Sequence, residues 1–189
     1  GTLESVINKA IELKYIALGL SEHLPRETQL QLYPEELELN LIPKDLDNQF
    51  KNYLLAAKSL KKSNQDIILL VGAETEFIDD SSIKICNLYR PELDYIVGSV
   101  HHVNQIPIDF DEKMYLQALE SSGSIEKLYE DYYDTQFEML NKLKPELIGH
   151  FDLIRIFNKN RNFKVNEVIF NKIKRNVDFI SSDNGLVEI

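Results

Sequence analysis

The chain has 189 residues and a mass of 21.9 kDa, and its 43% hydrophobic residues suffice for a sizeable core and exclude a disordered polypeptide. This length fits one ordinary domain and falls short of the roughly 250 residues typical of a closed eight-stranded barrel. The net charge of −10 gives a surface that repels nucleic acid and anionic lipid. We therefore expect neither nucleic acid nor a membrane as a partner.

The single cysteine, Cys86, excludes an intramolecular disulfide and any multi-cysteine zinc site, and it suits a reducing compartment. We interpret it as a small buried apolar residue. No apolar run approaches the ~20 residues needed to cross a bilayer, and no signal segment opens the chain. These features predict a cytoplasmic protein.

The first half of the chain alternates helical patterns with apolar runs. A helix is expected from residue 3 after a Thr2 N-cap, then an apolar run over 15–20 that leads to His23. Residues 24–43 contain three prolines among acidic residues, which predicts a long surface excursion with at most one helical turn. A second helix follows Pro43, and the apolar run 67–73 leads into Glu74.

The second half repeats this alternation. Helices are expected near 81–89, 111–120, 124–143 and 166–177, with apolar runs over 94–100, 147–149 and 185–189. Apolar runs that alternate with helices predict parallel strands joined by right-handed helical crossovers. The fold class is therefore α/β, and because no linker divides the chain we expect a single domain over residues 1–189.

Four apolar runs are each followed closely by a side chain that binds divalent metals well, namely His23, Glu74, His101 and His150. The carboxyl ends of parallel barrel strands converge on one face, so residues far apart in sequence can meet there. Taken singly, each histidine is better explained as a hydrogen-bonded loop residue, and Glu74 as a helix cap. Their joint occurrence favours a shared metal site.

Other residues near these strand ends suit an anionic substrate. Arg155 can bind phosphate oxygens with its forked guanidinium, or it can be a surface charge paired with an acid. Arg26 and His102 are further candidates for substrate binding. Asp152 would either accept a hydrogen bond that fixes the tautomer of a ligating histidine or only cap a helix.

Four stretches carry a resemblance to the polymerase and histidinol phosphatase (PHP) superfamily: Gly19–Arg26, Gly72–Glu76, Gly98–His102 and Gly149–Arg155. More narrowly, Glu22–Arg26 followed by Leu32–Glu36 resembles the histidinol-phosphate phosphatases within it. The resemblance implies a distorted seven-stranded TIM-like (β/α) barrel with two or three zinc, manganese or iron ions. The reaction would convert L-histidinol phosphate to L-histidinol and phosphate, in histidine biosynthesis.

The resemblance also assigns roles. His23, Glu74, His101 and His150 would be metal ligands, with Glu74 bridging and catalytic, and Arg155 would bind the phosphate during catalysis. The surface excursion over residues 24–43 would cover the mouth of the active site, and its residues Arg26 and Tyr33 would help to select a small phosphate ester as the substrate.

Two departures from the family pattern matter. Its members begin with a strand that carries His-x-His and end with a strand that carries Asp-x-His, and neither motif occurs here. We therefore expect an incomplete barrel that lacks its first and last strands, has little phosphatase activity alone and contains no recognisable general acid. The alternatives are a PHP phosphoesterase that acts on another small phosphate and a non-catalytic, degenerate barrel. The sequence predicts no oligomeric state.

Overall fold

The computed structural model describes residues 1–158 and 163–188. Its helices are α1 (Leu3–Glu12), α2 (Pro34–Glu38), α3 (Pro43–Ser63), α4 (Asp80–Tyr89), α5 (Glu112–Ser122), α6 (Ile125–Leu143) and α7 (Glu167–Ser182), with short 3-10 turns η1 (Gln29–Gln31), η2 (Arg90–Glu92) and η3 (Leu153–Arg155). Its strands are β1 (Ala17–His23), β2 (Ile68–Glu76), β3 (Tyr95–Ser99), β4 (His102–Val103), β5 (Ile106–Pro107), β6 (Leu147–Ile148) and β7 (Leu186–Val187).

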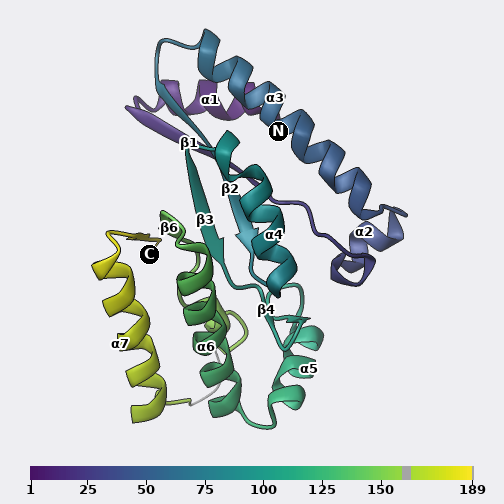
Figure 1. Cartoon of the computed structure of the whole chain (residues 1–189), viewed down its shortest axis with the longest axis vertical. Coiled ribbons are helices and arrows are strands. Elements are labelled where there is room, and N and C mark those ends of the chain that lie inside the picture. Colours follow the sequence, from purple (N-terminus) through teal and green to yellow (C-terminus); the bar gives the residue numbers. More distant parts are fainter. Residues whose placement is uncertain (159–162, 189) are drawn as a thin grey trace. The chain divides into compact units, whose positions relative to one another are not determined.

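The main sheet has five strands in the order β1-β2-β3-β6-β7 (Figure 1). Pairing is parallel between β1 and β2, between β3 and β6, and between β6 and β7. This arrangement confirms the predicted α/β class with parallel strands. Within the described residues β1 and β7 are the two ends of the strand order, so the sheet is not closed into a barrel.

The chain divides into two compact units, each of which is described by itself. Unit 1 comprises residues 1–74 and 85–96, and unit 2 comprises residues 75–84 and 97–189. Strands β2 and β3 are continuous through the boundary, which falls between Glu74 and Thr75 in β2. The prediction of a single domain over the whole chain stays a prediction.

In unit 1, one face of β1 and β2 packs against helices and the other is held close to an aromatic ring. Leu20, Leu69 and Val71 alternate along the strands and are buried, and α3 contacts both α1 and β1. A Cβ added at Gly72 would lie 2.3 Å from Cζ of Tyr95. Glycine is therefore required on this face of β2, because the tyrosine ring occupies the space of a side chain.

Asp94 joins three elements of unit 1 just before β3. Its carboxylate lies 2.6 Å from Nζ of Lys61 at the end of α3 and accepts a hydrogen bond of 2.6 Å from the backbone N–H of Val71 in β2. Burial raises the pKa of Asp94, but these two hydrogen bonds more than offset it and hold the pKa below its usual value. The pair therefore stabilises the folded unit most when Asp94 is ionised.

In unit 2, α6 is the most buried helix and packs against both α5 and α7. Asp134 of α6 pairs with Lys172 and Arg175 of α7 at 2.5 and 3.0 Å. A small antiparallel hairpin, β4–β5, turns through Asn104 and Gln105, both at positive φ, as two-residue hairpins require. This hairpin was not predicted from the sequence.

The predicted helices are all present, and the strand boundaries differ most at β1. This strand extends to His23 because its register with β2 continues to the pair His23 and Glu74. Residues 24–43 contain η1 and the five-residue α2, slightly more helix than expected. The predicted run 185–189 contains β7, and its residue 189 lies outside the described residues.

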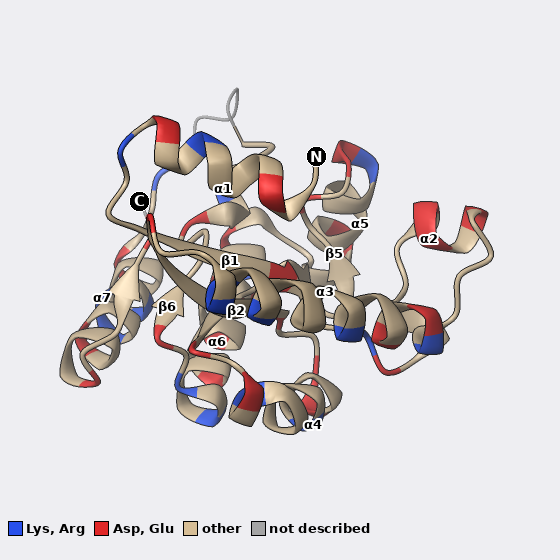
Figure 2. Cartoon of the chain, turned by 90° about the horizontal axis from the view of Figure 1, so that it is seen from above, with Lys and Arg blue, Asp and Glu red and all other residues tan. Residues whose placement is uncertain are grey.

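The helices differ in the charges that they carry. Helix α2 carries three glutamates and no basic residue, whereas α3 carries both signs (Figure 2). Among the described residues, no helix is both long and apolar enough to span a membrane.

Candidate metal centre

The carboxyl ends of β1 and β2 bring His23 and Glu74 together in unit 1. The two residues are register partners, and Nε2 of His23 lies 3.7 Å from Oε2 of Glu74. The backbone N–H of Leu24 donates to the carbonyl of Glu74 at 2.8 Å, which extends the pairing by one more bond. Parallel strands in register thus explain why two residues 51 positions apart meet.

Two further histidines meet in unit 2, after β3 and β6. The rings of His101 and His150 have centroids 5.6 Å apart. His101 is buried, with 5% of its surface exposed, whereas His150 is exposed. His101 is therefore enclosed by the protein, whereas solvent and small molecules can reach His150.

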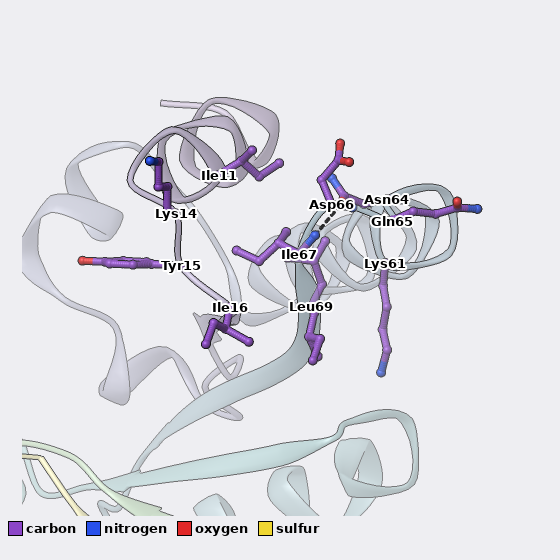
Figure 3. Close-up of a pocket in the computed structure, with 11 residues that line it drawn as sticks. Ile11, Lys14, Tyr15, Ile16, Lys61, Asn64, Gln65, Asp66, Ile67 and Leu69 are labelled. Atoms are coloured by element: carbon purple, nitrogen blue, oxygen red, sulfur yellow. Dashed lines mark hydrogen bonds between the residues drawn. The ribbon is translucent and has the colours of Figure 1, made fainter.

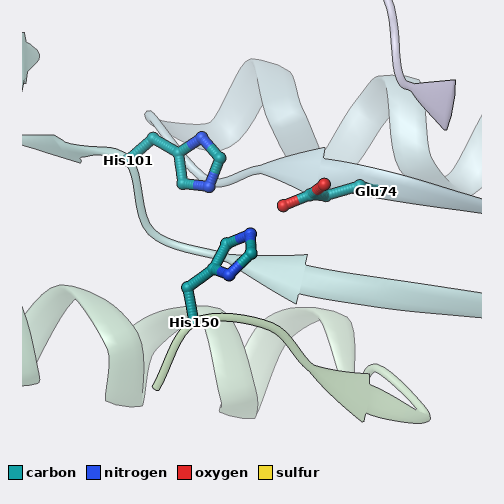
Figure 4. A group of neighbouring side chains, drawn as sticks. All are labelled: Glu74, His101 and His150. Atoms are coloured by element: carbon teal, nitrogen blue, oxygen red, sulfur yellow. The ribbon is translucent and has the colours of Figure 1, made fainter. Parts of the chain in front are cut away.

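Glu74 is the last residue of unit 1 on strand β2, and the next residue of the strand, Thr75, belongs to unit 2. Glu74, His101 and His150 each offer one ligand atom, and these atoms lie within 4.8 Å of one another (Figure 4). Ligands of a tetrahedral divalent ion bind it at about 2.0–2.2 Å. Two imidazoles and a carboxylate also match the ligand types that zinc, manganese and iron accept.

His101 and His150 each have a carboxylate at the Nδ1 atom. Asp109 Oδ2 lies 3.5 Å from Nδ1 of His101, and Glu188 Oε2 lies 3.2 Å from Nδ1 of His150. A carboxylate in this position fixes the tautomer and leaves Nε2 to bind a metal. The arrangement is the usual support of a ligating histidine.

Asp109 is the more buried of these two carboxylates. Burial raises the pKa of Asp109, the neighbouring His101 lowers it in part, and Glu76 raises it further. An ionised carboxylate in such surroundings is stabilised by a nearby cation.

Neither supporting carboxylate was predicted from the sequence. Glu188 follows the strand β7 directly, so the strand-end rule that selected Glu74 would also have selected it. Asp109 gave no such signal, because it reaches His101 only through the unanticipated β4–β5 hairpin.

The predicted phosphate ligand Arg155 lies beside His150 in unit 2. Both line a hollow of about 390 Å³ together with Asp152 and Glu188. Asp152 Oδ2 lies 3.3 Å from Nη1 of Arg155, and both side chains are mostly exposed. The role of Asp152 as a support for a ligating histidine stays a prediction, since its pairing in this structure is with the arginine.

The other predicted substrate-binding residues lie elsewhere. His102 is buried in β4 and lines a separate hollow of about 480 Å³ with Asp80 and Lys142. Arg26 pairs with Glu36 of α2, and its guanidinium carbon lies 4.8 Å from the centre of the Tyr33 ring. The two residues of the excursion therefore contact each other, and their roles toward a substrate stay predictions.

A hollow of unit 1 lies at the opposite end of its strands. It measures about 670 Å³ and is lined by the end of α1, the segment between α1 and β1, and the connection into β2, including Tyr15, Ile16 and Asp66 (Figure 3). Active sites of parallel barrels occur at the carboxyl ends of strands. This hollow at the amino ends is therefore not the predicted site.

Comparison with known proteins places these residues in a family context. The family model described as PHP domain matches residues 1–189. A probable histidinol-phosphatase of Schizosaccharomyces pombe is 40% identical over the whole chain, which covers 63% of that protein. Histidinol-phosphatases of Saccharomyces cerevisiae and Bacillus subtilis are 31% and 24% identical, over 67% and 66% of their lengths. The chain thus spans about two thirds of the length of these curated relatives.

Proposed function

Because this chain belongs to the PHP family, we propose that it is the core of a metal-dependent phosphomonoester hydrolase that converts L-histidinol phosphate to L-histidinol and phosphate. The observation that carries the proposal is the cluster of Glu74, His101 and His150 at the carboxyl ends of parallel strands. The names of the relatives supply the substrate.

The proposal includes the architecture and the compartment. The open five-stranded sheet would belong to a distorted (β/α)7 barrel, and the whole chain would form one domain of it. The enzyme would act in cytoplasmic histidine biosynthesis, and a sequence with the single cysteine Cys86 suits a reducing compartment.

Glu74, His101 and His150 would hold a divalent ion, and His23 would join them through its contact with Glu74. Bound divalent ions in such sites lower the pKa of a bound water toward about 7 and neutralise charge on phosphoryl oxygens. Asp109 and Glu188 would keep His101 and His150 in the tautomer that presents Nε2.

Arg155 would bind the phosphate of the substrate. Its guanidinium is mostly exposed and paired with Asp152 at 3.3 Å. An exposed pair of this kind is weak, so a phosphate dianion can displace the carboxylate. The hollow that Arg155 shares with His150 would then place the phosphate next to the metal ligands.

A substrate panel tests this function. The chain is loaded with zinc, manganese or iron, and phosphate release is measured from histidinol phosphate, from other small phosphomonoesters and from DNA ends. Even at the low activity expected of this chain alone, we expect histidinol phosphate to be preferred over the other substrates and the His150→Ala variant to lose the remaining activity. A preference for another phosphoester, or activity that survives His150→Ala, would contradict the proposal.

A further inference from the structure

The backbone at His150 is in a conformation that a histidine rarely adopts. Its φ is +47°, in the left-handed region, which costs energy for any residue with a Cβ. Lys144 has a similar φ at the end of α6, where helices commonly terminate in this way. His150 follows no helix, so surrounding structure must stabilise its turn.

Helix α6 provides that stabilisation through two fully buried side chains. The hydroxyl of Tyr132 lies 3.1 Å from the carbonyl oxygen of His150 and 3.2 Å from that of Phe151, and it donates its hydrogen to this pair. Nε2 of Gln136 donates to the carbonyl of Phe151 at 3.1 Å. Both carbonyls of the turn are thus bound by one face of α6.

The direction of the amide group of Gln136 is set from α7. Arg175 can only donate hydrogen bonds, and its Nε donates to Oδ1 of Asn176 at 3.0 Å. The amide nitrogen of Asn176 therefore faces Gln136 and donates to its Oε1 at 3.0 Å. Gln136 is left with its own nitrogen toward the turn, so the chain of hydrogen bonds runs one way, from α7 to the turn at His150.

The imidazole of His150 depends on this turn for its position. Its side chain is 42% exposed, and the carboxylate at its Nδ1 belongs to Glu188, whose side chain is 51% exposed. Exposed pairs restrain a side chain weakly. The turn on which the ring is mounted, in contrast, is held from the buried interior.

We propose that Tyr132 and Gln136, with Gln136 oriented by Asn176, are positioning residues that fix the turn at His150 and thereby place its imidazole for metal binding. The inference rests on the proposed metal centre and adds to it three residues that lie outside the ligand set. It predicts that small changes inside the helix pair α6–α7 alter metal binding without touching a ligand.

The test compares two neighbouring buried tyrosines. Tyr132→Phe removes the hydroxyl that binds the turn, and Tyr133→Phe is a matched control that removes a hydroxyl outside this chain of hydrogen bonds. Cobalt(II) is titrated into each purified chain, and its visible absorption reports both affinity and ligand geometry. We expect Tyr132→Phe to bind cobalt about 10-fold to 100-fold more weakly, the range for residues that support metal ligands, with an altered spectrum, and Tyr133→Phe to match the wild type.

A second variant, Gln136→Met, removes the other donor to the turn at similar volume and is expected to act in the same direction. Chemical unfolding of each metal-free variant measures its folded fraction. Unchanged affinity and spectrum in both variants would overturn the inference, and so would a loss of affinity that only follows the folded fraction. If the wild type itself binds no cobalt, the proposed metal centre fails, which is a different result from binding that is insensitive to Tyr132.

Discussion

Replacing Gly72 by alanine tests the packing of β2 just before the candidate metal ligand Glu74. A Cβ at this position would lie 2.3 and 2.4 Å from Cζ and Cε1 of Tyr95, whereas ordinary contacts are about 3.5–4.0 Å. The ring must therefore move by more than an ångström. The hydroxyl of Tyr95 now donates to the carbonyl of Leu20 at 3.2 Å, and this bond would be lost with the move.

The expected cost follows from these two effects. Overpacking in a well-packed site costs about 1–3 kcal/mol, and the lost hydrogen bond adds about 0.5–1.5 kcal/mol. Alanine recovers about 0.5–1 kcal/mol relative to glycine within a strand. We expect Gly72→Ala to lower the free energy of unfolding by about 0.5–4 kcal/mol, measured by urea denaturation.

The same substitution in a Tyr95→Ala background isolates the cause. Without the ring, Gly72→Ala should be neutral or slightly stabilising. Gly123→Ala is the control, because its φ of +84° makes alanine unfavourable while no atom lies within 4 Å of the added Cβ, so its cost should be equal in both backgrounds. If Gly72→Ala is equally destabilising with and without the ring, the steric argument is wrong.

Three further predictions concern charged groups. Asp94→Asn should destabilise the protein by about 1–2 kcal/mol at pH 7, as for a hydrogen bond to a charged group reduced by the partial exposure of Lys61. Because the pKa of Asp94 is lowered in the folded protein, its contribution is complete above the unfolded pKa of about 3.9 and is lost as the pH falls through the folded pKa. Unfolding at a series of pH values should therefore show the wild type and the variant converging in acid, and a constant difference would contradict this. Asp109→Ala should weaken zinc binding by about 10-fold or more through His101, and equal affinity in a chelator competition would refute that role. Arg155→Gln should weaken the binding of inorganic phosphate to the metal-loaded chain by about 5-fold, for an exposed contact worth about 1 kcal/mol, and unchanged binding would remove Arg155 from the site.

The sequence predicts the fold class well because its signal is local. Strands covered by crossover helices appear as apolar runs, and all four runs that precede a candidate ligand contain a strand of the sheet. The residues at which strands end are harder to predict from apolar runs. Polar residues such as Ser21 and Glu22 belong to β1 because β2 pairs with them, and pairing is a long-range property.

In the candidate site, too, some residues could be predicted from local sequence and others could not. His101 and His150 were found from the ends of their strands, and the structure brings their rings together. Asp109 was missed because a two-residue turn at positive φ, through Asn104 and Gln105, determines where it lies. The support of the turn at His150 was equally hidden, since it consists of side chains that face inward from a helix whose apolar pattern predicts only packing.

The most direct test of the account is a metal titration of the chain and of its Glu74→Gln, His101→Ala and His150→Ala variants. We predict that the wild type binds a divalent ion and that each substitution weakens the binding sharply. At a free metal concentration of 100 times the dissociation constant, binding stabilises the folded state by about 2.7 kcal/mol, or roughly 5–10 °C in the unfolding temperature. A wild type without this shift, or three variants that retain it, would contradict the claim that these side chains form one metal centre.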